Sequence, residues 1–380
     1  MSGFFTSADC DLDAFRAVVE VEVDLAQYPM AVGTAEGAVV YEAASLGEVP
    51  AAPEMAMMEL ARVLSTGPGI AIFRGGFDAG VVDAATEVFF ELIEEQRSAG
   101  ASAGDHFAAA GANDRIWNSL EKLALRAPSV FAAYHDNAVV DLASRAWLGP
   151  GYQLTAQVNV VNPGGDAQSP HRDYHLGFMT EREAASYPAH VHRLSPALTL
   201  QGAVAHCDMP VETGPTTYLP HSHKFEPGYL AWHRPEFAQY FAAHRSQPSL
   251  SKGDVVFFNP ALFHAAGQNR TSDVRRTANL LQVSSGFGRA MESVDRRAMC
   301  EALYPVLLDT ARIGGYTPGL ERVVAASAEG YAFPADLDHD QPTDGLKPPS
   351  MAGIVAQCLR EAVPVEVLVD RLDERFGRRE

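Results

Sequence analysis

Residues 252–264 read Lys252-Gly253-Asp254-Val255-Val256-Phe257-Phe258-Asn259-Pro260-Ala261-Leu262-Phe263-His264. Gly253 and Asp254 mark a turn, and the apolar run that follows them predicts a short buried strand. Similar short apolar runs, separated by Gly, Pro, Asn and Asp, recur through the neighbouring sequence at 154–161, 198–205, 216–219 and 277–283. Runs of this kind indicate β structure with turns, as in a sandwich or a barrel.

Helical periodicity comes before and after this β-rich part. Apolar residues recur at helical spacing over 51–65 and 83–97, and helical segments return after residue 289. We therefore expect a mainly β protein with flanking helices (α+β). The expected division of the chain is an N-terminal strand and helix extension (1–65), a core domain (66–288) and a C-terminal helical extension packed on the core (289–380).

Composition narrows the class of partner. Hydrophobic residues form 47% of the 380-residue chain and charged residues 20%, as in ordinary soluble proteins. The net charge of −19 disfavours nucleic acid and anionic membrane surfaces as partners. The sequence has no secretory signal, no apolar stretch of membrane-spanning length and no C-x-x-C pair. We expect a cytoplasmic protein that acts on a small molecule, as a monomer or a homodimer.

A possible metal site begins at Ser169-Pro170-His171-Arg172-Asp173-Tyr174-His175. On an extended backbone, His171 and Asp173 point to the same side, so an imidazole and a carboxylate share one space. This spacing alone is weak, because chance often produces it. His264, at the end of the stretch quoted above, is a candidate third ligand, although a core histidine is the alternative. Two histidines and one carboxylate would form the facial triad of non-haem Fe(II) oxygenases.

A cationic residue a short way along the sequence from His264 adds to this pattern. A facial triad leaves positions open for a bidentate 2-oxo acid and for dioxygen. The distal carboxylate of a 2-oxo dicarboxylate needs a cation, and the planar fork of arginine suits it best. Arg275 follows His264 on the next apolar run. Arg276 would face the opposite side of that strand, so only one of the two can point inward. A surface salt bridge is the alternative for Arg275.

These residues resemble the phytanoyl-CoA dioxygenase family of Fe(II)/2-oxoglutarate oxygenases. His171-Arg172-Asp173-Tyr174-His175 is similar to the H-x-D-x-H segment of that family. The run from Lys252 through His264 to Gly267-Gln268-Asn269 and Arg275 resembles the K-G-D-x-x-F-F-x-P-x-x-x-H-x-x-G-Q-N block of that family and its Arg almost residue for residue. Looser similarities extend the resemblance to about residues 66–285.

The resemblance implies a double-stranded β-helix (jelly-roll) core. It also implies that His171, Asp173 and His264 bind iron and that Arg275 holds the distal carboxylate of 2-oxoglutarate. Gln157 matches a position that often contacts this co-substrate. The implied reaction uses Fe(II), 2-oxoglutarate and dioxygen to hydroxylate an unactivated C–H bond of a small-molecule metabolite, with release of succinate and CO2. Related halogenases carry Gly or Ala where this chain has Asp173, which favours oxygenation here.

Several alternatives remain open at this point. Strand parity places His175 beside the triad, where it contacts substrate or is a plain strand residue. The rival functions are a non-catalytic jelly-roll or cupin-like binding protein, a metal-dependent hydrolase, and an oxygenase of this family that performs desaturation or ring formation. The sequence does not identify the substrate. No basic cluster is dense enough to require the phosphates of coenzyme A, which favours a free small molecule.

Overall fold

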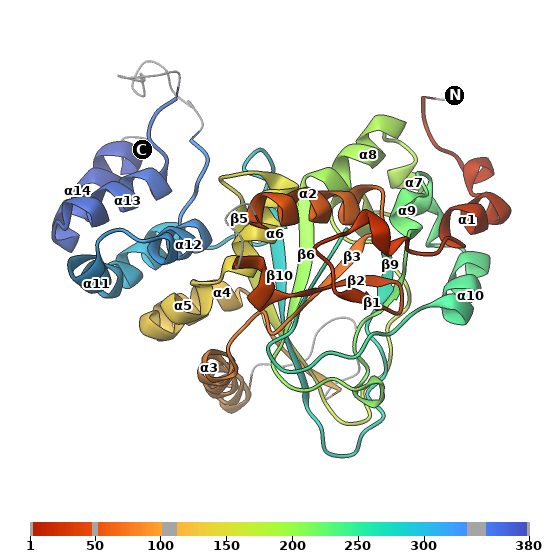
Figure 1. Ribbon diagram of the computed structural model, residues 1–380, viewed down its shortest axis with the longest axis horizontal. Helices are drawn as coiled ribbons and strands as arrows, with labels where there is room; N and C mark the ends of the chain where they lie inside the picture. The colour runs from red at the N-terminus through yellow and green to blue at the C-terminus, as the bar shows by residue number, and fades with distance from the viewer. Residues whose placement is uncertain (1–2, 48–51, 101–111, 333–346, 378–380) are drawn as a thin grey trace.

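A large mixed sheet forms the centre of the protein (Figure 1). The computed structural model describes residues 3–47, 52–100, 112–332 and 347–377. Within these ranges, eight strands pair in the order β1-β2-β3-β8-β6-β10-β5-β4. All neighbouring pairs are antiparallel except the parallel pair β2 and β3. The strands are β1 (Gly33–Ala35), β2 (Ala38–Glu42), β3 (Ile70–Arg74), β4 (Asn113–Ile116), β5 (Gln153–Val161), β6 (Thr199–Ala205), β8 (Val255–Phe258) and β10 (Arg276–Ser284).

A smaller layer of extended chain accompanies the large sheet. Strands β7 (Thr217–Leu219) and β9 (Phe263–Ala265) pair antiparallel. Isolated bridges extend this layer on both sides, because His171 pairs with His264 and Tyr218 pairs with Ser246. The apolar runs of the sequence therefore do form strands, and they lie in two separate sets.

The two faces of the large sheet differ in chemistry. Alternate residues of the central strands, such as Val158, Phe257 and Leu281, join the main hydrophobic core. Their neighbours on the opposite face, such as Gln157, Phe258 and Gln282, line a cavity. This alternation follows from the two-residue period of a strand.

Helices cover the core face of the sheet (Figure 1). They include α2, α3, α4, α5 and α6 before the β-rich segment and α11, α12, α13 and α14 after it. Their bounds are α2 (Ala52–Ser65), α3 (Ala79–Ser98), α4 (Ser119–Arg126), α5 (Pro128–His135), α6 (Ala138–Leu148), α11 (Arg296–Gly314), α12 (Pro318–Ser327), α13 (Met351–Glu361) and α14 (Val365–Phe376).

A second group of helices lies at the other end of the protein, around a separate hydrophobic cluster that includes Phe15, Phe225 and Phe263 (Figure 1). Those with residues in this cluster are α1 (Leu12–Val19), α7 (Glu181–Ala184), α9 (Gly228–Ala231) and α10 (Pro235–His244). Helix α8 (Ala189–Ala197) lies nearby and contacts β6. No helix in the described parts of the chain is long and apolar enough to cross a membrane.

The architecture is mixed α+β, with one large sheet and flanking helices. The described helices contain more residues than the described strands, so the expectation of a mainly β protein is wrong for the chain as a whole. The excess of helix arises because the core face of the sheet is covered by helices from both ends of the chain. The proposed division at residues 65 and 288 stays a prediction.

Phe257 provides a test of this core. Its ring is fully buried and meets the ring of Phe73 edge to face, and a side chain at Gly202 would collide with it. We expect Phe257→Ala to lower the free energy of unfolding by about 3–5 kcal/mol, because the cavity cannot close fully. Phe287→Ala is the matched control, since the Phe287 side chain is 78% exposed. Urea unfolding measures both, and equal losses would contradict this packing.

Candidate metal centre

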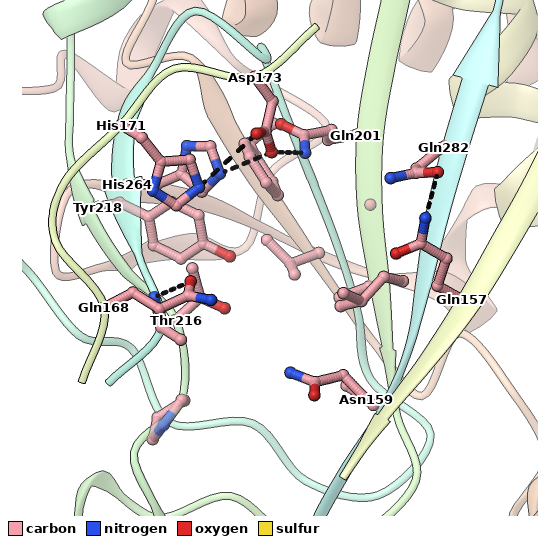
Figure 2. Close-up of a pocket in the computed structure, with 18 of the residues that line it drawn as sticks. Gln157, Asn159, Gln168, His171, Asp173, Gln201, Thr216, Tyr218, His264 and Gln282 are labelled. Atoms are coloured by element: carbon pink, nitrogen blue, oxygen red, sulfur yellow. Dashed lines mark hydrogen bonds and ion pairs between the residues drawn. The ribbon is translucent and has the colours of Figure 1, made fainter. Parts of the chain in front are cut away.

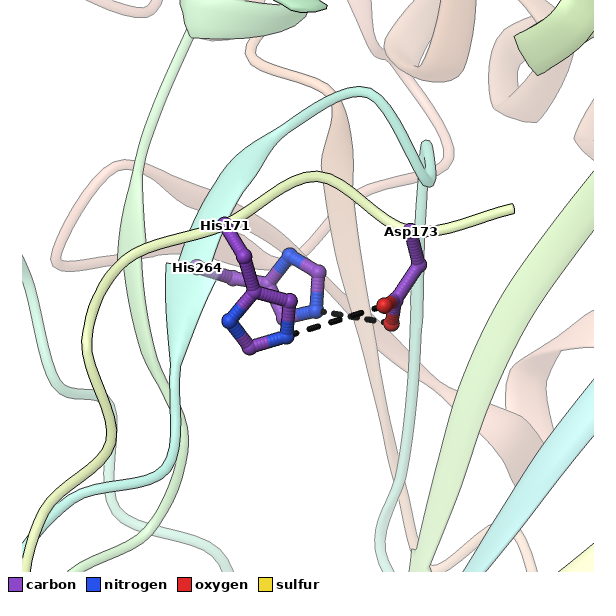
Figure 3. A group of neighbouring side chains, drawn as sticks. All are labelled: His171, Asp173 and His264. Atoms are coloured by element: carbon purple, nitrogen blue, oxygen red, sulfur yellow. Dashed lines mark ion pairs between the residues drawn. The ribbon is translucent and has the colours of Figure 1, made fainter. Parts of the chain in front are cut away.

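His171, Asp173 and His264 converge although they come from two distant segments (Figure 3). His264 lies on β9, and His171 lies in the connection between β5 and the short 3-10 helix η4 (His175–Phe178). Two backbone hydrogen bonds join the segments: His171 N–H donates to the His264 carbonyl at 3.0 Å, and His264 N–H donates to the His171 carbonyl at 3.2 Å. The two histidines therefore lie opposite one another on paired backbones.

The side chains present three ligand atoms to one point. One nitrogen or oxygen from each residue lies within 4.8 Å of the other two. His264 Nε2 is 3.3 Å from Asp173 Oδ2, and His171 Nε2 is 3.7 Å from Asp173 Oδ1. This spacing suits atoms that surround one metal ion rather than atoms that are only hydrogen-bonded in pairs.

The other nitrogen of each imidazole is already occupied. His171 Nδ1 donates to the Ser169 carbonyl at 3.0 Å, and His264 Nδ1 donates to the Leu262 carbonyl at 2.9 Å. Because a carbonyl can only accept, each Nδ1 carries the proton and each Nε2 keeps its lone pair. Backbone carbonyls commonly orient metal-binding histidines in this way.

Electrostatics favour the protonation states that a metal needs. Burial lowers the pKa of His171, and the nearby His264 lowers it further, so His171 is neutral at neutral pH. Burial alone would raise the pKa of Asp173, but the surrounding polar groups, which include the Gln201 amide that donates to Oδ2, hold it below its ordinary value. A carboxylate and two imidazoles are the donor set of a non-haem Fe(II) site.

The triad opens into a cavity of about 650 Å³ (Figure 2). Its walls are largely apolar, with a set of carboxamide side chains that includes Gln157, Asn159, Gln201 and Gln282. Trp117 and Phe178 also line it and are 41% and 58% exposed, so aromatic rings stand at its opening. A cavity of this size with few polar groups is typical of a small-molecule site.

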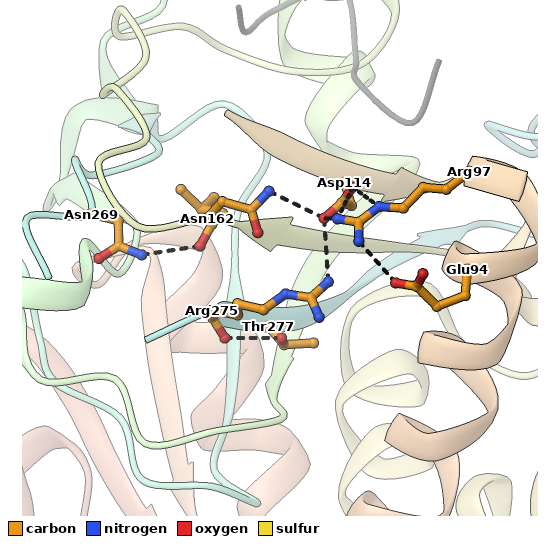
Figure 4. Close-up of polar contacts among 8 residues, drawn as sticks. Glu94, Arg97, Asp114, Asn162, Asn269, Arg275 and Thr277 are labelled. Carbon is orange, nitrogen blue, oxygen red and sulfur yellow. Dashed lines mark hydrogen bonds and ion pairs between the residues drawn. The ribbon is translucent and has the colours of Figure 1, made fainter. Parts of the chain in front are cut away.

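In the structure Arg276, and not Arg275, faces the cavity. Arg275 is not among the residues that line the cavity. Its Nη2 lies 3.3 Å from Asp114 Oδ2 (Figure 4), and its guanidinium lies over the ring of Phe90. Arg276 lines the cavity and is 3% exposed. The expectation that Arg275 faces the cavity is therefore wrong. The two arginines do point to opposite sides at the start of β10, as predicted, but the sequence did not reveal which of the two faces the cavity.

Arg276 lacks a complete set of partners. One Nη donates to the Gly214 carbonyl at 2.6 Å, while Nε is buried without a hydrogen-bond partner. Among the described residues, no carboxylate pairs with it. Burial lowers the pKa of Arg276 to about 10, so the side chain remains a cation at neutral pH. A buried cation of this kind requires an anion.

His175 does not join the triad, contrary to the prediction from strand parity. Tyr174 and His175 have φ values of 60° and 39°, so the chain leaves the extended conformation directly after Asp173 and starts η4. His175 is exposed, does not line the cavity, and its Nδ1 lies 3.0 Å from Ser195 Oγ. The i, i+2 argument holds for His171 and Asp173 only.

Gln157 does face the cavity. Its Oε1 accepts from Arg115 Nη1 at 3.1 Å, and its Nε2 donates to Gln282 Oε1 at 3.3 Å. Gln201, which we did not predict from the sequence, also lies at the site: its Nε2 donates to Asp173 Oδ2 (Figure 2). A signal was present, because Gln201 is a polar residue in the middle of the apolar run 198–205.

Comparisons with known proteins agree with this geometry. A family model described as phytanoyl-CoA dioxygenase (PhyH) matches residues 66–277. The matched segment begins just before β3 and ends on β10, and it contains all three residues of the triad as well as Arg275 and Arg276.

Individual relatives are more distant. The dioxygenase trt7 of Aspergillus terreus is 29% identical over 154 residues, which are 40% of this chain and 48% of that protein. The dioxygenase olcK of Penicillium canescens is 28% identical over 174 residues, which are 45% of this chain and 51% of that protein. The matches therefore span about half the length of these relatives.

A solved structure is also similar. It is that of SnoN, a non-heme α-ketoglutarate-dependent epimerase from nogalamycin biosynthesis, with 22% sequence identity and a TM-score of 0.39. The similarity covers 61% of this chain and 84% of that chain.

The triad predicts a sharp contrast between two histidines of the same segment. We expect His171→Ala to weaken Mn(II) binding more than about 100-fold, since even the groups that orient metal ligands contribute about 10–100-fold. His175→Ala should leave the affinity unchanged, because His175 points away from the triad. Electron paramagnetic resonance of free Mn(II) measures both. A loss in His175→Ala as large as that in His171→Ala would refute the assignment.

Proposed function

The chain belongs to the phytanoyl-CoA dioxygenase family of Fe(II)- and 2-oxoglutarate-dependent dioxygenases, and from this premise we propose that it hydroxylates an unactivated C–H bond of a small-molecule metabolite. The cofactors of the family are iron and 2-oxoglutarate. The observation that carries the proposal is the triad of His171, Asp173 and His264, with ligand atoms within 4.8 Å of one another at the wall of a cavity.

The residues of the cavity fit both cofactors. His171 Nε2, His264 Nε2 and an Asp173 oxygen would hold the iron, because the two Nδ1 atoms are bound to backbone carbonyls. Arg276 would hold the distal carboxylate of 2-oxoglutarate, because it is a buried cation with an unpartnered Nε. This proposal replaces Arg275, whose guanidinium pairs with Asp114 outside the cavity.

When bound, iron with 2-oxoglutarate and dioxygen supplies the oxidation itself, with succinate and CO2 as the other products. The protein contributes position and environment. Three side chains leave part of the coordination sphere open. The apolar walls exclude bulk water, which strengthens the interaction of Arg276 with an anion.

The polar groups of the cavity support a particular class of substrate. Asn159 Oδ1 and Gln201 Oε1 are buried acceptors without a hydrogen-bond partner. The 2-oxoglutarate dianion offers only acceptors, so it cannot satisfy them. A substrate with O–H or N–H groups can, and leaving such buried acceptors unpaired would cost about 1–3 kcal/mol each. We therefore propose a free, apolar-bodied molecule with at least one hydroxyl or N–H group, rather than an unsubstituted acyl chain on coenzyme A.

We also propose that the core is a double-stranded β-helix. Strands β5, β10, β6 and β8 lie side by side in the large sheet. The second layer contains β7 and β9 together with the bridges at His171 and Ser246. Two facing layers of this kind, with successive strands in opposite layers, support a jelly roll closed around the cavity.

The arginine pair offers a matched test of co-substrate binding. We expect Arg276→Gln to weaken 2-oxoglutarate binding by at least about thirtyfold, since removing one partner of a buried charge pair costs about 2–5 kcal/mol. Arg275→Gln should have little effect, because its guanidinium contacts Asp114 and Phe90. Calorimetric titration with Mn(II) present measures both affinities. The opposite ranking would return the role to Arg275.

The function itself is tested in two steps. Under anaerobic conditions, Fe(II) and 2-oxoglutarate should together produce a visible charge-transfer band, and Asp173→Ala should abolish it. Small molecules that carry hydroxyl or N–H groups are then screened in air against palmitoyl-CoA, with succinate release as the signal. A product heavier by one oxygen atom supports hydroxylation, whereas a product lighter by two hydrogen atoms identifies desaturation or ring formation. No band with the wild-type protein would contradict the proposal.

A further inference from the structure

The two oxygens of Asp173 have different surroundings. Oδ1 lies 3.7 Å from His171 Nε2 and accepts no hydrogen bond from the described residues. Oδ2 lies 3.3 Å from His264 Nε2 and also accepts a hydrogen bond from Gln201 Nε2, drawn in Figure 2. The carboxylate is therefore held at one oxygen by a neutral donor that is not itself a metal ligand.

The orientation of the Gln201 amide follows from the hydrogen-bonding capacity of the Asp173 carboxylate. An ionised carboxylate only accepts hydrogen bonds, so the NH2 end of the amide must face Asp173. The carbonyl end then faces elsewhere, and it has no partner in the described structure. Reversing the amide would place two acceptors against each other inside a low-dielectric site.

Gln201 lies on a strand that is paired on both sides. It lies in the middle of β6, which pairs with β8 on one side and β10 on the other, and its register partners are Phe258 and Gln282. The residue is 8% exposed. A donor fixed on a central strand restrains the carboxylate more strictly than a group on a loop would.

We propose that Gln201 is a positioning residue. It keeps Asp173 Oδ2 in a hydrogen bond, so that Asp173 binds the metal through Oδ1 alone. The inference rests on the proposed function but goes beyond it, because it concerns how many coordination positions stay open. A carboxylate that binds through both oxygens would occupy a position that 2-oxoglutarate or dioxygen needs. Partners of metal ligands are commonly worth about 10–100-fold in metal affinity.

Gln282 is the matched control. It is the register partner of Gln201 on β10, carries the same amide and lines the same cavity. Its Oε1 accepts from Gln157, and no hydrogen bond joins it to Asp173 in the described structure. A change at Gln282 therefore alters the cavity wall but not the support of the carboxylate.

The experiment compares the full-length wild type with three variants, using Mn(II) alone as the probe. Gln201→Met removes the amide at nearly constant size. Gln201→Asn keeps an amide that is too short to reach Asp173, and Gln282→Met is the control. We expect both Gln201 variants to bind Mn(II) about 10–100-fold more weakly and Gln282→Met to match the wild type. At saturating Mn(II), water-proton relaxation should report fewer metal-bound waters in Gln201→Met, because Oδ2 is then free to bind.

The outcomes separate clearly. Wild-type Mn(II) affinity and hydration in both Gln201 variants would overturn the proposal, and so would an equal loss in Gln282→Met. Thermal unfolding of each variant identifies a loss of fold, and Gln201→Asn provides the test if Gln201→Met does not fold. None of these measurements uses 2-oxoglutarate or turnover. A wild-type protein that binds Mn(II) but not 2-oxoglutarate would refute the proposed function and leave this inference standing.

Discussion

The site depends on the backbone pairing of His171 with His264. These residues are far apart in the sequence, and two reciprocal hydrogen bonds bring their backbones together. Asp173 then needs only the two-residue period of an extended chain to reach the same point, and its N–H donates to the Pro260 carbonyl. The three ligand atoms are thus positioned by main-chain geometry. Preorganisation of this kind reduces the entropy lost when the ligands are fixed.

The two faces of the large sheet have different roles. One face is apolar and is sealed by helices from both ends of the chain, which gives the strands a rigid support. The other face carries amides and two buried arginines, Arg115 and Arg276, around the cavity. Asp114 shows how the cation outside the cavity is neutralised, because it pairs with both Arg97 and Arg275 (Figure 4). Arg276 has no such partner among the described residues, which is why we propose Arg276, and not Arg275, as the residue that holds the co-substrate.

The sequence was informative where a short-range rule applied and the local conformation was regular. Strand periodicity predicted the β-rich segment, and the placement of His171 with Asp173 needed only two residues of extended chain. The same rule failed at His175, because Tyr174 and His175 adopt positive φ values that no periodicity reveals. The phase of β10 and the contact between Gln201 and Asp173 depend on pairing between distant strands. A single sequence contains no direct signal for such pairing.

We propose that one metal ion and one 2-oxo acid occupy this cavity on specified side chains. A crystal structure of the protein with Mn(II) and 2-oxoglutarate tests this proposal most directly. We expect Mn(II) to be bound by His171 Nε2, Asp173 Oδ1 and His264 Nε2, with the distal carboxylate of 2-oxoglutarate against Arg276. Mn(II) bound elsewhere, or a co-substrate carboxylate on Arg275, would contradict it.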